Sequence, residues 1–134
     1  MKRTALFLIG LFLTGCIGGR LYFDKPTRYD VKLSMLKMKK HYEILQAWVD
    51  GHPTDRDPAE SVDHLIAEGG FLINQLPDRN PVIWQETIRE MQQSLTFLGD
   101  SIREDQQKRA GYHFRNVRKS CADCHMRFRV GFNF

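Results

Sequence analysis

Residues 81–102 read PVIWQETIREMQQSLTFLGDSI, and their apolar side chains recur at gaps of three and four positions. An α-helix turns once in 3.6 residues, so side chains at this spacing share one face. Asn80 is a favoured cap, and Pro81 suits the first helical position because proline lacks an amide hydrogen that this turn leaves unpaired. The pattern predicts an amphipathic helix that ends within the polar run 103–109. The apolar residues on the shared face of a helix are called its seam here, and in this helix they are Trp84, Ile88, Met91, Leu95, Leu98 and Ile102.

Two similar seams precede this helix. Residues 29–50 predict a first helix by the same spacing. Residues 57–77 predict a second helix, with Asp57 as its cap, Pro58 at the first position and the glycine pair 69–70 as a weak or closely packed point. The seams are Val31, Met35, Met38, Tyr42, Leu45 and Val49 in the first helix, and Val62, Leu65, Ile66, Leu72, Ile73 and Leu76 in the second.

The last part of the chain predicts one more helix, over residues 111–129. Gly111 follows the polar run and marks the predicted break from the preceding helix. No segment alternates apolar and polar residues as a strand does. Four amphipathic helices with short connections predict an all-α fold, an antiparallel four-helix bundle. The apolar face of the last helix is Phe114, Val117, Cys121, Cys124 and Phe128.

Residues 121–125, within this last helix, read CADCH. C-x-x-C-H is the signature by which haem is attached covalently, because two thiols add to its vinyl groups and the histidine offers an imidazole nitrogen to the iron. On a helix the three side chains fall within roughly 100° of one another. The sequence therefore predicts one haem c, with Cys121 and Cys124 as thioether sites and His125 as the proximal iron ligand.

Three other interpretations of the cysteine pair are open. A thioredoxin-like redox disulfide would require a βαβ context, and no strand is predicted. A zinc site needs four ligands, and the sequence offers neither a second cysteine pair nor two histidines at zinc-finger spacing. The third interpretation is that both cysteines are inert core residues.

The N-terminus carries a separate signal. Lys2 and Arg3 precede the apolar run 5–13, as in a secretory signal peptide. The sequence LTGC at 13–16 resembles the bacterial lipobox, which implies cleavage before Cys16 and lipidation of its thiol. An ordinary signal peptide cleaved elsewhere, or an uncleaved anchor, is the alternative. The expected organisation is 1–15 signal peptide, 16–28 lipidated N-terminus and tether, and 29–134 four-helix domain.

Such a lipoprotein would be anchored in the periplasm. In the lipoprotein class, a residue such as Ile17 after the lipidated cysteine implies the outer membrane rather than the inner one. Haem is attached to C-x-x-C-H outside the cytoplasmic membrane. The export signal at the N-terminus is therefore consistent with the haem motif near the C-terminus.

The charge of the chain is uneven. The net charge is +4 and becomes +2 without Lys2 and Arg3, so the basic pI does not indicate a nucleic-acid partner. Residues 103–129 hold eight basic and three acidic side chains. They form either a solvated helix face, a docking surface for an acidic redox partner, or counter-charges for haem propionates.

The position of the motif resembles the terminal helix of class II c-type cytochromes, the cytochrome c′ family. The pattern that carries this resemblance extends from Phe114 and Val117 through the motif to Phe128-Arg129. The resemblance implies haem c on the last helix of a bundle and a propionate contact at Arg129. It also implies that the chain can form a homodimer through its first two helices.

In this family a residue of the first helix covers the distal side of the iron. Alignment on Asp30 and Lys32 places Met38 nearest that position, with Met35 one turn away. A Met38 ligand would raise the potential and suit electron transfer. Alternatively, Met38 only packs in the core, or His41 competes with it for the distal side of the iron.

We therefore expect a monohaem electron carrier without catalysis of its own. The alternative is a five-coordinate haem protein that binds nitric oxide or another small gas. A third hypothesis is a haem-free lipoprotein whose cysteine pair is a thiol switch.

Overall fold

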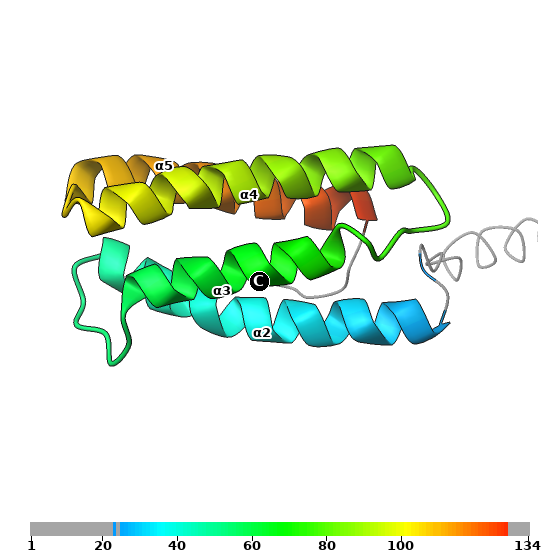
Figure 1. The fold of residues 1–134 in the computed structure, drawn as a ribbon, viewed down its shortest axis with the longest axis horizontal. Helices are drawn as coiled ribbons and strands as arrows, with labels where there is room; N and C mark the ends of the chain where they lie inside the picture. The colour runs from blue at the N-terminus through cyan, green and yellow to red at the C-terminus, as the bar shows by residue number, and fades with distance from the viewer. Residues whose placement is uncertain (1–22, 24, 129–134) are drawn as a thin grey trace, which may run out of the picture.

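Four α-helices form the part of the chain that the computed structural model describes, residues 23 and 25–128. They run alternately in opposite directions, and each lies beside the next (Figure 1), while α2 closes the ring against α5. The predicted all-α, antiparallel four-helix bundle is confirmed. The helices are α2 (Lys25–Val49), α3 (Pro58–Leu72), α4 (Pro81–Arg103) and α5 (Gln107–Phe128).

The apolar seams meet in one core. All six predicted seam residues of α4 are buried, and the seam of α2 alternates buried with half-buried side chains. On α5 the predicted face is buried except at Cys121, which is half-buried. The period of three and four therefore located the core-facing side of these helices correctly.

Trp84 joins three parts of this core. Its side chain is fully buried, and its Nε1 donates a hydrogen bond of 2.8 Å to the carbonyl oxygen of Leu72 at the end of α3. The rings of Phe23 and Phe128 meet its ring edge to face, each at a centroid distance of 5.1 Å. This packing holds the ends of α3 and α5 against the start of α4.

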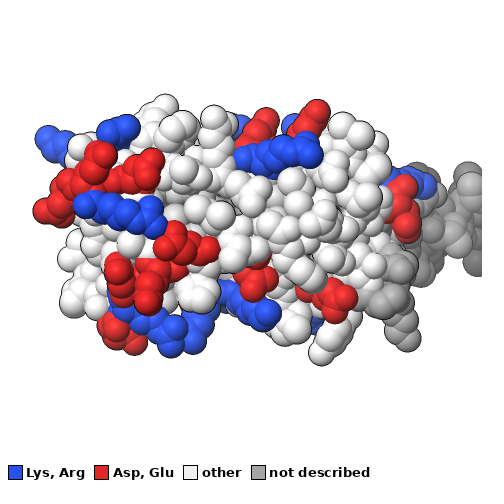
Figure 2. Space-filling model, in the orientation of Figure 1, with Lys and Arg blue, Asp and Glu red and all other residues white. Residues whose placement is uncertain are grey.

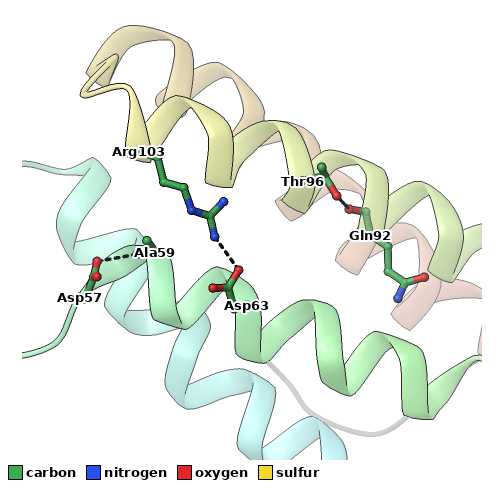
Figure 3. Close-up of polar contacts among 6 residues, drawn as sticks. All are labelled: Asp57, Ala59, Asp63, Gln92, Thr96 and Arg103. Carbon is green, nitrogen blue, oxygen red and sulfur yellow. Dashed lines mark hydrogen bonds and ion pairs between the residues drawn. The ribbon is translucent and has the colours of Figure 1, made fainter.

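The two predicted caps differ in their outcome. Asp57 caps α3, because its carboxylate accepts a hydrogen bond of 2.8 Å from the Ala59 amide (Figure 3). Asn80 precedes α4 in a left-handed conformation, with φ 53° and ψ 46°, and its side chain makes no capping hydrogen bond. The predicted position of Asn80 as the N-cap before Pro81 is confirmed, but its side chain does not cap the helix, and an asparagine suits this position because it tolerates positive φ.

Two helix ends differ from the prediction. α2 begins at Lys25 rather than at residue 29, with Pro26 in its first turn, where a missing amide hydrogen costs nothing. α3 ends at Leu72 rather than near residue 77, and Leu76 is 50% exposed. The apolar residues after Leu72 therefore belong to the connection to α4.

The predicted break at Gly111 is also wrong. α4 ends at Arg103 and α5 already begins at Gln107, because Asp105 reverses the chain in a left-handed conformation with φ 54°. Gly111 lies inside α5 and faces α2, where a Cβ would come within 3.9 Å of Val49. The polar run thus contributes the last residue of α4, a short connection and the first residues of α5.

Close contacts join α3 to α4. A Cβ on Gly69 would lie 3.0 Å from the Cγ of Gln92 and 3.2 Å from the Cε of Met91, so the glycine is a point of close packing.

Farther along, Arg103 and Asp63 form an ion pair of 2.7 Å between the two helices (Figure 3). Figure 2 shows charged side chains of both signs crowded at this end of the α3–α4 face and few in its middle.

Contact is sparsest between α2 and α5 among the four neighbouring pairs. At one end Gln107 ties them together, because its amide donates to the carbonyl oxygens of Trp48 and Val49 at 3.1 and 3.3 Å. Farther from that end the ring of Tyr42 packs on Phe114 at 5.2 Å. The space beyond this contact is where the candidate site lies.

Candidate functional site

A cavity of about 600 Å³ opens between α2 and α5. It is within the size range of sites that bind small molecules and cofactors. All four helices contribute to its walls, and their contribution is mainly apolar. Its apolar floor is Leu65, Leu72, Ile88, Met91, Leu95 and Val117.

The C-x-x-C-H motif lies on the wall that α5 provides. Cys121, Cys124 and His125 all line the cavity, as expected for side chains that share one side of a helix. Cys124 is buried, whereas Cys121 and His125 are half-buried. Both cysteines are free thiols, and the structure brings them to the same cavity as the imidazole.

Burial controls the chemistry of the two thiols. It raises the pKa of Cys121 to about 11 and the pKa of Cys124 to about 12. Both are therefore protonated at neutral pH, whereas thiol–disulfide exchange requires a thiolate. These pKa values disfavour the interpretation of the pair as a thiol switch.

Burial has the opposite effect on His125, whose pKa it lowers below the usual 6.5. Removing a cationic imidazolium from water costs free energy, so the neutral form is favoured. A neutral imidazole is the form that binds a metal ion. His125 thus has the protonation state that an iron ligand requires.

Methionines line the same cavity from other helices. Met38 and Met35 contribute from α2, on the wall opposite the motif-bearing helix, and Met38 is 8% exposed. Met91 of α4 also lines the cavity, although the sequence indicated only a core role for it. Seam spacing cannot distinguish a core thioether from one beside a cavity, since both face inward.

His41, considered above as a competing ligand, is not among the residues that line the cavity. It faces α3, where its ring stacks on that of His64 with a centroid distance of 4.3 Å and an interplanar angle of 19°. Its Nδ1 lies 3.3 Å from the hydroxyl oxygen of Ser61. The structure therefore separates His41 from the motif.

Sequence reasoning missed the polar side chains at the cavity. Arg118 lines it from α5 and Tyr42 from α2. Burial raises the pKa of Tyr42, and the nearby guanidinium of Arg118 partly opposes this shift. Arg118 precedes Cys121 by three positions and His125 by seven, so helical spacing alone places it on the same side as the motif.

Two of the predicted functional residues, Cys16 and Arg129, lie outside the described residues. Over the part that is described, no helix is both long enough and apolar enough to cross a membrane. Residues 23 and 25–128 also contain no group of three or more histidine, cysteine, aspartate or glutamate side chains placed to hold a metal ion.

Comparison of the chain with protein-family models, curated proteins and solved structures found no match.

Proposed function

We propose that the chain is a membrane-anchored periplasmic monohaem c-type cytochrome that transfers electrons and catalyses no reaction of its own. The observation that carries this proposal is that Cys121, Cys124, His125 and Met38 line one largely apolar cavity. Lipidation at Cys16 would supply the anchor, with the outer membrane as the expected location.

The donor groups at the cavity fit haem c. Two protonated thiols can form thioether bonds to vinyl groups, and burial, which lowers the pKa of His125, favours the neutral imidazole that iron requires. The volume of about 600 Å³ suits a cofactor of this class, and the apolar floor suits a porphyrin face.

A bound haem would supply the iron that accepts and releases one electron. The protein's part is to hold and tune it. His125 would bind from α5, and Met38 would offer a soft thioether from α2, which favours the reduced state. The apolar floor would exclude water and so raise the potential further.

Basic side chains on α5 favour an acidic redox partner. Arg115, Arg118 and Arg127 of α5 are exposed, and Arg118 lies at the cavity. Electrostatic attraction of this kind would mainly accelerate association, and its effect would fall as salt increases.

The proposal is tested by expressing the chain with the proteins that mature c-type cytochromes and recording the pyridine haemochrome spectrum. We expect a c-type spectrum with one haem per chain. The Cys121→Ala/Cys124→Ala variant should lose it, whereas Met126→Ala, at a side chain that is 75% exposed, should retain it. A purified, folded chain without haem would overturn the proposal.

A second experiment decides the sixth iron position. If Met38 is a ligand, the ferric protein is low-spin with a thioether charge-transfer band, and Met38→Leu becomes high-spin while Met91→Leu does not. A high-spin spectrum of the unmodified chain would favour the gas-binding alternative. An unchanged low-spin spectrum in Met38→Leu would exclude Met38 as the ligand.

A further inference from the structure

An apolar stripe runs along the outer side of α2. Tyr29, Leu33 and Leu36 are 67%, 43% and 47% exposed. At about 100° per residue they fall within roughly 60° of one another and nearly opposite the buried side of α2. These three residues, called here the outer stripe, therefore lie on the solvent-facing side of α2.

Basic side chains surround the outer stripe. Lys32 flanks one edge, Lys37 flanks the other edge and pairs with Glu68 at 3.5 Å, and Lys40 continues the line of the stripe by one turn; all three lysines are exposed. Residues 25–40 contain six basic side chains and one acidic side chain, Asp30. An apolar helix face bordered by lysines is the pattern of helices that lie on anionic lipid surfaces.

The chain length before α2 agrees with this arrangement. Lys25 follows Cys16 by nine positions in the sequence, which limits their separation to about 30 Å even for an extended chain. The stripe begins four positions after Lys25 and spans about two turns of α2. A lipid on Cys16 would hold the outer stripe within reach of the bilayer surface.

We propose that the outer stripe and its lysines form a second membrane contact, which lays α2 on a phospholipid surface that carries anionic headgroups. The contact rests on the proposed anchoring at Cys16, but it does not depend on haem. Acyl chains and a basic apolar face are separate signals, and together they fix orientation as well as attachment.

This contact would orient the cavity. Of the cavity-lining residues of α2, Tyr42 and Gln46 lie roughly a quarter turn or more around the helix from the stripe, whereas Glu43 lies near its edge. With the outer stripe on the membrane, the gap between α2 and α5 would open beside the bilayer surface, with Glu43 at the edge nearest the lipid. A redox partner in the aqueous phase or beside the chain could then approach the cavity.

The test uses the full, lipidated chain on vesicles of phosphatidylglycerol and phosphatidylcholine. A polarity-sensitive fluorophore is attached at Leu36→Cys, with Val82→Cys as a matched control at a 63% exposed apolar residue of α4. The unsubstituted chain, labelled in the same way, reports any reaction at Cys121 or Cys124. We expect a blue shift at position 36 and none at position 82.

Charge reversal makes the test specific. In the labelled chain, Lys32→Glu/Lys40→Glu should abolish the shift at position 36 while the chain still floats with vesicles. Lys108→Glu/Arg115→Glu makes the same change of charge on α5 and should leave the shift intact. Vesicles of phosphatidylcholine alone should give a shift at least severalfold smaller.

The outcomes separate the two proposals. A chain that floats but shows no shift at position 36 overturns the membrane contact and leaves anchoring intact. A chain that does not float overturns both. A shift that is equal on the two kinds of vesicle, and grows with the protein-to-lipid ratio, assigns the outer stripe to a second copy of the chain and overturns the lipid contact.

Discussion

At the scale of single residues, Trp84 provides the sharpest test of core packing. Trp84→Phe removes the hydrogen bond to Leu72 and part of the indole volume. The Leu72 carbonyl keeps a bond of 3.0 Å from the Gln75 amide, so it is not left unpaired. We expect the free energy of unfolding in urea to fall by about 1–3 kcal/mol.

The matched control for this prediction is Trp48→Phe. Trp48 is half-buried, so this change should cost less, about 1 kcal/mol or below. Equal losses in the two variants would contradict the role given to the buried indole.

Single residues also show what the sequence could reveal about the site. Cys121, Cys124 and His125 were found because their chemistry and spacing form a motif. Arg118 shares their side of the helix, but an arginine on a polar helix is ordinarily solvated, so nothing in its identity signalled a cavity. Tyr42 was recognised only as a seam residue, because no local pattern shows where two helices separate.

At the scale of elements, the contact between α3 and α4 depends on one glycine of a pair. Alanine favours a helix over glycine by about 1 kcal/mol. In Gly70→Ala the free energy of unfolding should rise by nearly this amount, because the new Cβ would come no closer than 3.9 Å to another side chain. Gly69→Ala would crowd Gln92 and Met91, so we expect it to be at least about 1 kcal/mol less stable than Gly70→Ala. Thermal unfolding of both variants measures the difference, and equal stabilities would contradict close packing at Gly69.

The contact between α2 and α3 should depend on pH. Burial and, next, the neighbouring His64 lower the pKa of His41, and Arg56 and Lys40 add to this shift while Glu68 opposes it. The unfolded chain therefore binds a proton more readily at this position. The contribution of neutral His41 to the free energy of unfolding is fully present above pH 6.5, and it is lost as the pH decreases through the lowered pKa of the folded state.

His41→Gln tests this pH dependence. The variant should lose less stability than the unmodified chain between pH 7 and pH 5, in urea unfolding at each pH. Some dependence should remain, because burial also lowers the pKa of His113 and His125. His52→Gln, in the exposed connection before α3, should follow the unmodified chain. Parallel curves for all three proteins would contradict the prediction.

Element boundaries were harder to predict than the elements. The seams identified four helices because burial imposes a period on the sequence. The residue type of Gly111 predicts a break, although a helix tolerates a glycine where a neighbouring helix comes close. The true turn uses Asp105, whose left-handed conformation depends on how α4 and α5 meet. Such tertiary causes leave little trace in local sequence.

At the scale of the whole molecule, the sparse contact between α2 and α5 predicts where haem would matter most. A bound haem would fill a cavity that all four helices line and would join α5 to α2. Binding to the native state alone stabilises that state. The haem-free Cys121→Ala/Cys124→Ala chain should therefore unfold at a lower urea concentration than the haem-loaded chain.

Hydrogen exchange would locate this effect. Amides of α2 and of the C-terminal half of α5 should exchange faster without haem, whereas amides at the α3–α4 contact should change little below the global unfolding limit. A uniform change along all four helices, or none, would contradict the location of the site.

The most direct test of the central claim, that haem is bound covalently at the motif, is the intact mass of the purified, denatured chain after expression with the c-type maturation proteins. The account predicts one haem mass per chain that survives denaturation and, after digestion, stays with the peptide containing residues 121–125. A chain of unmodified mass, with both Cys121 and Cys124 open to alkylation once unfolded, would contradict it.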